Sequence, residues 1–170
     1  LVCAALVVAA FITARRFYDS ERIGLIVALI YGLCTYNWAH SRTYFTEPLA
    51  ALFILLSLYK CLCAEKAADY IVAGVCGGAA LLTRADSALA LPFVGLYALF
   101  RHSGLTWRRR AVIAAAFGAG FLMLASWALL YNEARFGSPF KTGYGASQSG
   151  KSGFVTPLYV GLYGFLFSPG

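Results

Sequence analysis

The stretch Ala111–Tyr131, AVIAAAFGAGFLMLASWALLY, decides the fold class of this chain because it contains no charged residue. A helix needs about 20 apolar residues to cross the hydrocarbon core of a bilayer, and this stretch meets that length. The basic cluster Arg108–Arg110 precedes it, and a polar run begins at Asn132. The stretch is therefore predicted to form a membrane-spanning helix.

The composition of the whole chain agrees with a membrane environment. Hydrophobic residues make up 61% of its 170 positions, charged residues make up 12%, and the mean hydropathy is +0.71. Soluble domains carry about 25% charged residues, so we expect lipid to be the solvent for most of this chain. The chain begins at Leu1 without a methionine and stops at Gly170. We expect residues 1–170 to be part of a single transmembrane domain that continues beyond both ends.

Other apolar runs flank this stretch. They are Leu1–Ala14, ended by Arg15-Arg16; Ile23–Trp38, capped by Ser20; Pro48–Ala64; Tyr70–Leu82; Ala85–Phe100; and Phe154–Phe167, which either crosses the membrane or lies on it. Together they predict an all-α, polytopic bundle of about six to seven membrane helices, some short or broken. We expect Tyr70–Phe100 to form two short helices that meet at Thr83–Asp86, and Gly74, Gly77 and Gly78 to admit a neighbouring backbone.

The positive charges divide unevenly between alternate loops. One side receives Arg15, Arg16, Arg22, Lys60, Lys66, Arg101, Arg108, Arg109 and Arg110, and the other receives Arg42, Arg84, Arg135, Lys141 and Lys151. Cytoplasmic loops carry the excess of Lys and Arg, so the first side is predicted to be cytoplasmic. The segments His40–Glu47, Thr83–Asp86 and Asn132–Gly153 then face outward together.

The net charge of +7 does not indicate a nucleic-acid partner, because no basic face with interleaved aromatic residues is present. The five cysteines lie in or beside apolar segments and form no CxxC pair. They are interpreted as packing residues.

The outward segment before the third apolar run contains His40, Arg42 and Glu47. A carboxylate at a helix start is stabilised by the helix dipole, so Glu47 is either a capping acid or a ligand for a metal ion or polar substrate. Arg42 is able to hold a phosphate or to pair with Glu47. His40 is more simply a surface histidine, and one His with one Glu does not make a metal site.

Two further outward segments carry candidate residues. Arg84 and Asp86 form a structural ion pair at the helix corner, or else Arg84 receives a lipid-borne phosphate. The segment after Tyr131 contains Asn132 and Arg135, followed by a glycine-rich loop with Tyr144. A loop of about twenty residues is typical of a functional lid or of a disordered segment. In a lid, Tyr144 would stack on a sugar or lie at the interface.

These segments, in this order, resemble the membrane glycosyltransferases of the GT-C type. The resemblance is carried by Ala14–Phe17, by Ser41–Leu49, by the glycine-rich run Gly77–Arg84, by Tyr131–Pro139 with Gly143-Tyr144, and by Gly164–Gly170. It is closest to the protein mannosyltransferase and aminoarabinose-transferase relatives, families 39 and 83, with prokaryotic members among them.

The resemblance implies an inverting enzyme in the cell membrane of a prokaryote. It would move a sugar from a polyprenyl-phosphate donor to a lipid, protein or glycan acceptor on the extracytoplasmic side. It implies substrate or metal binding for Glu47, with a divalent metal ion as the one candidate cofactor, and lipid-phosphate contact for Arg84. The family's acidic base lies in an outward loop that would precede Leu1. The resemblance implies no role for Asp86.

Two other functions remain open. A transporter or flippase would line its path with Arg84 and Asp86, but it would distribute polar residues along the depth of several helices. Here they gather toward one face, which favours the transferase. A non-catalytic membrane scaffold is the third hypothesis.

Overall fold

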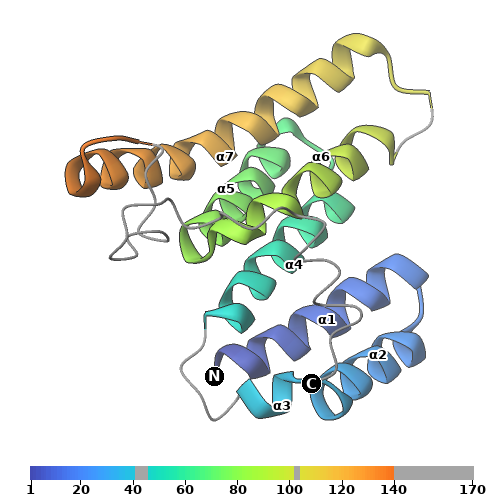
Figure 1. Ribbon diagram of the computed structural model, residues 1–170. Coiled ribbons are helices and arrows are strands. Elements are labelled where there is room, and N and C mark those ends of the chain that lie inside the picture. The colour runs from blue at the N-terminus through green and yellow to red at the C-terminus, as the bar shows by residue number, and fades with distance from the viewer. Residues whose placement is uncertain (41–45, 102–103, 140–170) are drawn as a thin grey trace, which may run out of the picture. The chain divides into compact units, whose positions relative to one another are not determined.

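The computed structural model describes residues 1–40, 46–101 and 104–139, and every regular element in those ranges is a helix (Figure 1). The all-α prediction is therefore confirmed for them. Arg42, Tyr144 and the run Phe154–Phe167 lie outside the described residues. By its internal contacts the chain divides into two units, Leu1–Trp127 and Ala128–Gly170, and each is described by itself. Whether residues 1–170 belong to one domain stays a prediction.

In its described residues, the first unit contains seven complete elements and most of an eighth. The elements are α1 (Val2–Tyr18), α2 (Glu21–Cys34), α3 (Asn37–His40), α4 (Glu47–Cys63), α5 (Ala67–Thr83), the 3₁₀ helix η1 (Ala85–Leu89), α6 (Leu91–Phe100) and α7 (Trp107–Phe136), which runs on into the second unit.

The helix ends follow local hydrogen bonding. The Ile23 amide donates to the Ser20 hydroxyl over 3.4 Å, which confirms the predicted cap of α2. Helix α1 continues through Arg15 and Arg16 to Tyr18, so the prediction that these arginines end it is wrong. Arginine favours helix, and its charge suits the negative end of the helix dipole.

Helix α2 ends at Cys34 rather than at Trp38. The Thr35 hydroxyl donates to the Tyr31 carbonyl and accepts the Asn37 amide, over 3.2 Å in the second case. Side chains of this kind offer the backbone an alternative to a continued helix. The chain therefore turns at Thr35 and begins the short helix α3.

The predicted corner within Tyr70–Phe100 is confirmed. Helix α5 ends at Thr83, η1 follows it, and α6 begins at Leu91 with Pro92 in its first turn. Proline is tolerated there because its missing N–H would have no partner in the helix.

The core of the first unit lies between α4, α5, α6 and α7. It is formed by the buried residues Cys61, Ala64, Tyr70, Ala73, Val94, Ala98, Ile113 and Ala116. Most are small, so the helices approach closely. The buried Ser57 hydroxyl donates to the Ala73 carbonyl over 2.7 Å and joins α4 to α5.

Helices α5 and α7 come closest at their glycines. A Cβ on Gly74 would overlap the Phe117 carbonyl oxygen, and one on Gly120 would overlap that of Ile71. A Cβ on Gly78 would lie 2.8 Å from the Phe121 oxygen. The predicted backbone approach is thus confirmed at Gly74 and Gly78, whereas Gly77 faces the Leu91 side chain.

Among the described residues, α7 alone is long and apolar enough to cross a membrane, judged by length and composition. Helices α1, α4 and α5 have 17 residues each, which corresponds to about 25 Å at the α-helical rise. Against the expected six to seven membrane helices, some short or broken, one helix of membrane-crossing length is found in these ranges. Turns at Asp19, Thr35 and Arg84 end three of the shorter helices, and only the turn at Thr35 lies within a predicted apolar run.

Candidate functional site

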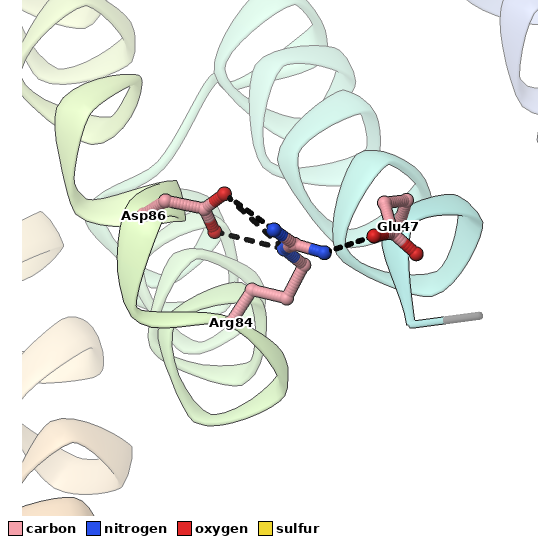
Figure 2. Close-up of polar contacts among 3 residues, drawn as sticks. All are labelled: Glu47, Arg84 and Asp86. Carbon is pink, nitrogen blue, oxygen red and sulfur yellow. Dashed lines mark hydrogen bonds and ion pairs between the residues drawn. The ribbon is translucent and has the colours of Figure 1, made fainter. Parts of the chain in front are cut away.

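The hairpin of α4 and α5 brings Glu47 and Arg84 into contact (Figure 2). Glu47 is the first residue of α4, and Arg84 follows the last residue of α5. The two helices have 17 residues each and a short turn between them. Equal antiparallel helices return the chain to its starting level, so residues 37 positions apart in sequence meet.

Arg84 bridges two carboxylates. Its Nε donates to Asp86 Oδ1 over 2.9 Å, and its Nη2 donates to Asp86 Oδ2 over 2.8 Å. Its Nη1 donates to Glu47 Oε1. The paired bonds to Asp86 form the fork that an arginine makes with a carboxylate. Asp86 therefore fixes the plane of the guanidinium, and Nη1 is left to face α4.

Only one carboxylate oxygen of Glu47, Oε1, takes part in this arrangement. Its Oε2 is buried and has no hydrogen-bond partner among the described residues. The side chains of Arg84, Glu47 and Asp86 are 31%, 42% and 59% exposed. The cluster is therefore open to solvent, with one carboxylate oxygen still able to accept a hydrogen bond or a cation.

Contacts within the cluster shift the pKa values of Asp86 and Arg84. The hydrogen bonds from Arg84 lower the pKa of Asp86 below its usual value. The hydrogen bond to Asp86, with the charges of Asp86 and Glu47, raises the pKa of Arg84. Both shifts favour the charged forms, a positive Arg84 and a negative Asp86.

This arrangement offers two kinds of chemistry. An anionic oxygen that displaced Glu47 would meet Nη1 of an arginine whose plane Asp86 already holds. A hydroxyl or a cation would instead meet the unpartnered oxygen of Glu47. In the part of the chain that the structure describes, no group of three His, Cys, Asp or Glu side chains lies close enough to hold a metal ion.

The other predicted site residues lie elsewhere or are not described. His40 is the last residue of α3, with its ring centroid 6.1 Å from that of Tyr36. Asn132 and Arg135 belong to the second unit. Asn132 donates to the Pro139 carbonyl over 3.2 Å, and Arg135 donates to the Tyr131 hydroxyl.

Asp86 is the member of the cluster to which the family resemblance gives no role. The signal is its place two residues after Arg84, across the break between α5 and η1. At such a corner both side chains project from the same turn, which permits the fork. The predicted ion pair between Arg84 and Asp86 is observed, and the contact of Arg84 with a lipid-borne phosphate stays a prediction.

An apolar groove between α6 and α7 begins near the cluster. It has a volume of about 510 Å³ and extends from Ala88 and Leu91 past Phe117 and Phe121 to Ile113. Ala88 belongs to η1, the same short helix as Asp86. Ala88, at one end of the groove, therefore follows Asp86 by two positions along the chain.

No protein-family model, curated protein or solved structure matches this chain.

Proposed function

We propose that the chain is part of a polytopic membrane glycosyltransferase of the GT-C type. It would transfer a sugar from a polyprenyl-phosphate donor to an acceptor on the extracytoplasmic side. The observation that carries the proposal is the arginine clamp: Arg84 held by Asp86 and facing Glu47 at one end of a set of apolar helices.

Membrane embedding is supported by the apolar exterior of the helices. Only 22% of the 18-residue apolar stretch within α7 is buried, so this helix is not the enclosed core of a soluble protein. Helix α2 likewise exposes a row of large apolar side chains, namely Leu25, Ile26, Leu29, Ile30 and Leu33. Exposed apolar surface of this extent marks an interface with lipid or protein. The shorter helices would then cross as members of the bundle or as broken spans.

The distribution of charge along the helices supports the orientation. Arg15 and Arg16 share a pocket with Tyr59, Arg101 donates to the Cys61 carbonyl, and Lys66 shares a pocket with Arg109. These contacts join the basic helix ends at the level opposite to Arg84. The basic end is therefore proposed to face the cytoplasm, and the arginine clamp to face outward.

Arg84 is proposed to bind the donor phosphate and to stabilise the charge that develops on it as the sugar departs. A guanidinium positioned in advance does this without reorganisation during the reaction, and Asp86 supplies the positioning. The phosphate would replace Glu47 on Nη1. Glu47, once released, would accept a hydrogen bond from a sugar hydroxyl or hold a divalent metal ion.

The apolar groove gives the lipid part of the donor a place to lie. A polyprenyl chain is entirely apolar, and the walls of the groove are Leu, Phe, Pro, Ala and Gly residues together with Ile113. The groove starts at η1, so a chain lying in it would have its phosphate near Arg84. The base that deprotonates the acceptor is not assigned to any of these residues.

The test is sugar transfer by the full-length protein in proteoliposomes, with a fluorescent polyprenyl-phosphate sugar as donor. We expect Arg84→Gln to reduce transfer by about a hundredfold or more, because one charge-stabilising donor contributes about that much. We expect Glu47→Gln to raise KM or reduce kcat. The matched control is Arg15→Gln with Glu21→Gln, which removes an ion pair at the opposite end and should leave transfer unchanged.

Transfer that survives both Arg84→Gln and Glu47→Gln would contradict the site. Uptake of the labelled substrate without any covalent product would instead establish a transporter. The absence of both activities in the full-length wild-type protein would leave the scaffold hypothesis.

A further inference from the structure

A second pocket lies at the basic end of the first unit, between the α4–α5 turn and the start of α7. It has a volume of about 650 Å³. Lys66 and Arg109 line it, together with one acid, Glu65. Glu65, Lys66 and Arg109 are exposed. Tyr70 and Ile113 also line the pocket, and both are buried. The pocket thus has a charged rim and an apolar floor.

The rim has a net positive charge, and its surroundings add to it. Arg108 and Arg110 flank Arg109 in the first turn of α7. Ala67, which also lines the pocket, is the first residue of α5. The amide groups at the start of α5 are not free, because the Asp69 carboxylate accepts the Glu65 and Lys66 amides over 3.0 Å each. The cations of the rim and of the first turn of α7, with the positive end of the α7 dipole, favour an anion.

The walls of the pocket distinguish a lipid from a small soluble anion. Leu105 and Val112 line it, and Val112 is 54% exposed. Farther along α7, Leu122 and Met123 are also exposed. Apolar surface therefore continues from the pocket onto the exterior of α7, where an acyl chain would lie. A free phosphate has no apolar group that could pack against this wall.

We infer that this pocket binds the head group of an anionic phospholipid. Lys66 and Arg109 would contact the lipid phosphate, and the first part of an acyl chain would pack on Val112 and Leu105. The site is separate from the arginine clamp and does not depend on sugar transfer. It shares only the proposed membrane embedding.

The experiment measures lipid binding to the full-length protein in neutral detergent at physiological salt. Short-chain phosphatidylglycerol is titrated, with short-chain phosphatidylcholine and inorganic phosphate as separate probes, and bound lipid is counted by native mass spectrometry. We expect Lys66→Gln with Arg109→Gln to weaken phosphatidylglycerol binding about thirtyfold, since each cation near a lipid phosphate contributes about fivefold.

The matched control is Arg16→Gln with Arg22→Gln. Both residues are exposed and lie at the basic end, but neither lines the pocket. The same loss of charge should change the affinity by less than about threefold, because salt screens charges beyond about 8 Å. An equal loss in the control would mean that the attraction is diffuse, and it would overturn the inference.

A third variant tests the apolar wall and does not depend on the charged residues. Val112→Asn keeps both cations and changes an exposed position, so the fold should survive. We expect it to weaken phosphatidylglycerol binding about fivefold through lost apolar contact. Unchanged affinity in this variant would overturn the inference. So would phosphatidylcholine that binds as tightly as phosphatidylglycerol, or inorganic phosphate that displaces the lipid at equal concentration.

Discussion

At the scale of single residues, the two carboxylates around Arg84 have different roles. Asp86 lies two positions away and makes the paired bonds, so its contact is local and forms with the corner itself. Glu47 lies on another helix and makes one bond, with its second oxygen unpartnered among the described residues. A ligand would therefore compete with Glu47 for Arg84, while Asp86 continues to hold the guanidinium.

The positioning role of Asp86 has a measurable consequence. We expect Asp86→Asn to lower kcat about tenfold, because Arg84 keeps its charge but loses the fork that orients it. Asp86→Glu should recover part of the loss. Steady-state kinetics of sugar transfer with the full-length protein provides the measurement. If Asp86→Asn raised KM alone, the residue would contact substrate directly.

The same carboxylate predicts a dependence of stability on pH. The pKa of Asp86 is lowered in the folded chain by the hydrogen bonds from Arg84, so folding favours its ionised form. Its contribution is fully present above the unfolded pKa of about 3.9 and is lost as pH falls through the folded value. The Tm difference between wild type and Asp86→Asn should therefore be constant above about pH 5 and shrink below about pH 4. Circular dichroism measures both Tm values. A Tm difference that grew toward low pH would contradict this account.

The sequence by itself points to Glu47 and Arg84, because isolated charges between apolar runs are conspicuous. It does not predict that they touch, since that contact depends on the matched lengths of two helices. The hydrogen bond from Arg101 to the Cys61 carbonyl is likewise not predictable from the sequence. Nothing in the local pattern around either residue indicates which partner a long side chain selects.

At the scale of the elements, the packing of α5 on α7 depends on glycine. Gly74 and Gly120 each lie against a backbone carbonyl of the other helix, with no space for a Cβ. The glycine run in α5 is plain in the sequence and predicts the close approach of a neighbouring backbone. The identity of that neighbour is not predictable, because α7 is apolar all round and shows no preferred face.

Substitution of these glycines separates close packing from helix propensity. We expect Gly120→Val to destabilise the fold by about 2 kcal/mol, as overpacking does, because the helices must move apart. Gly118→Ala is the matched control, since a Cβ there meets nothing within 4 Å. It should be neutral or slightly stabilising. Thermal unfolding of both variants in detergent provides the comparison, and equal effects would argue against the close contact.

At the scale of the whole chain, composition predicts the fold class more securely than the number of spans. The scarcity of charge points to helices in lipid, and every described element is helical. The length of each span is less predictable, because Thr35 ends α2 within a run that reads as continuous. Helix α4 keeps its predicted length, whereas α5 and α7 extend beyond their predicted runs at both ends.

The proposed orientation places the arginine clamp outside the cell and the basic helix ends inside. Cysteine accessibility tests this central claim most directly. In a variant without the native cysteines, single cysteines are introduced at the exposed positions Thr46 and Ala85, beside the clamp, and at Lys66 and Arg108, at the basic end. Intact cells are treated with a membrane-impermeant maleimide. We predict labelling at positions 46 and 85, and labelling at 66 and 108 only after permeabilisation. Labelling of positions 46 and 85 from opposite sides of the membrane, or equal labelling of all four positions in intact cells, would contradict the account.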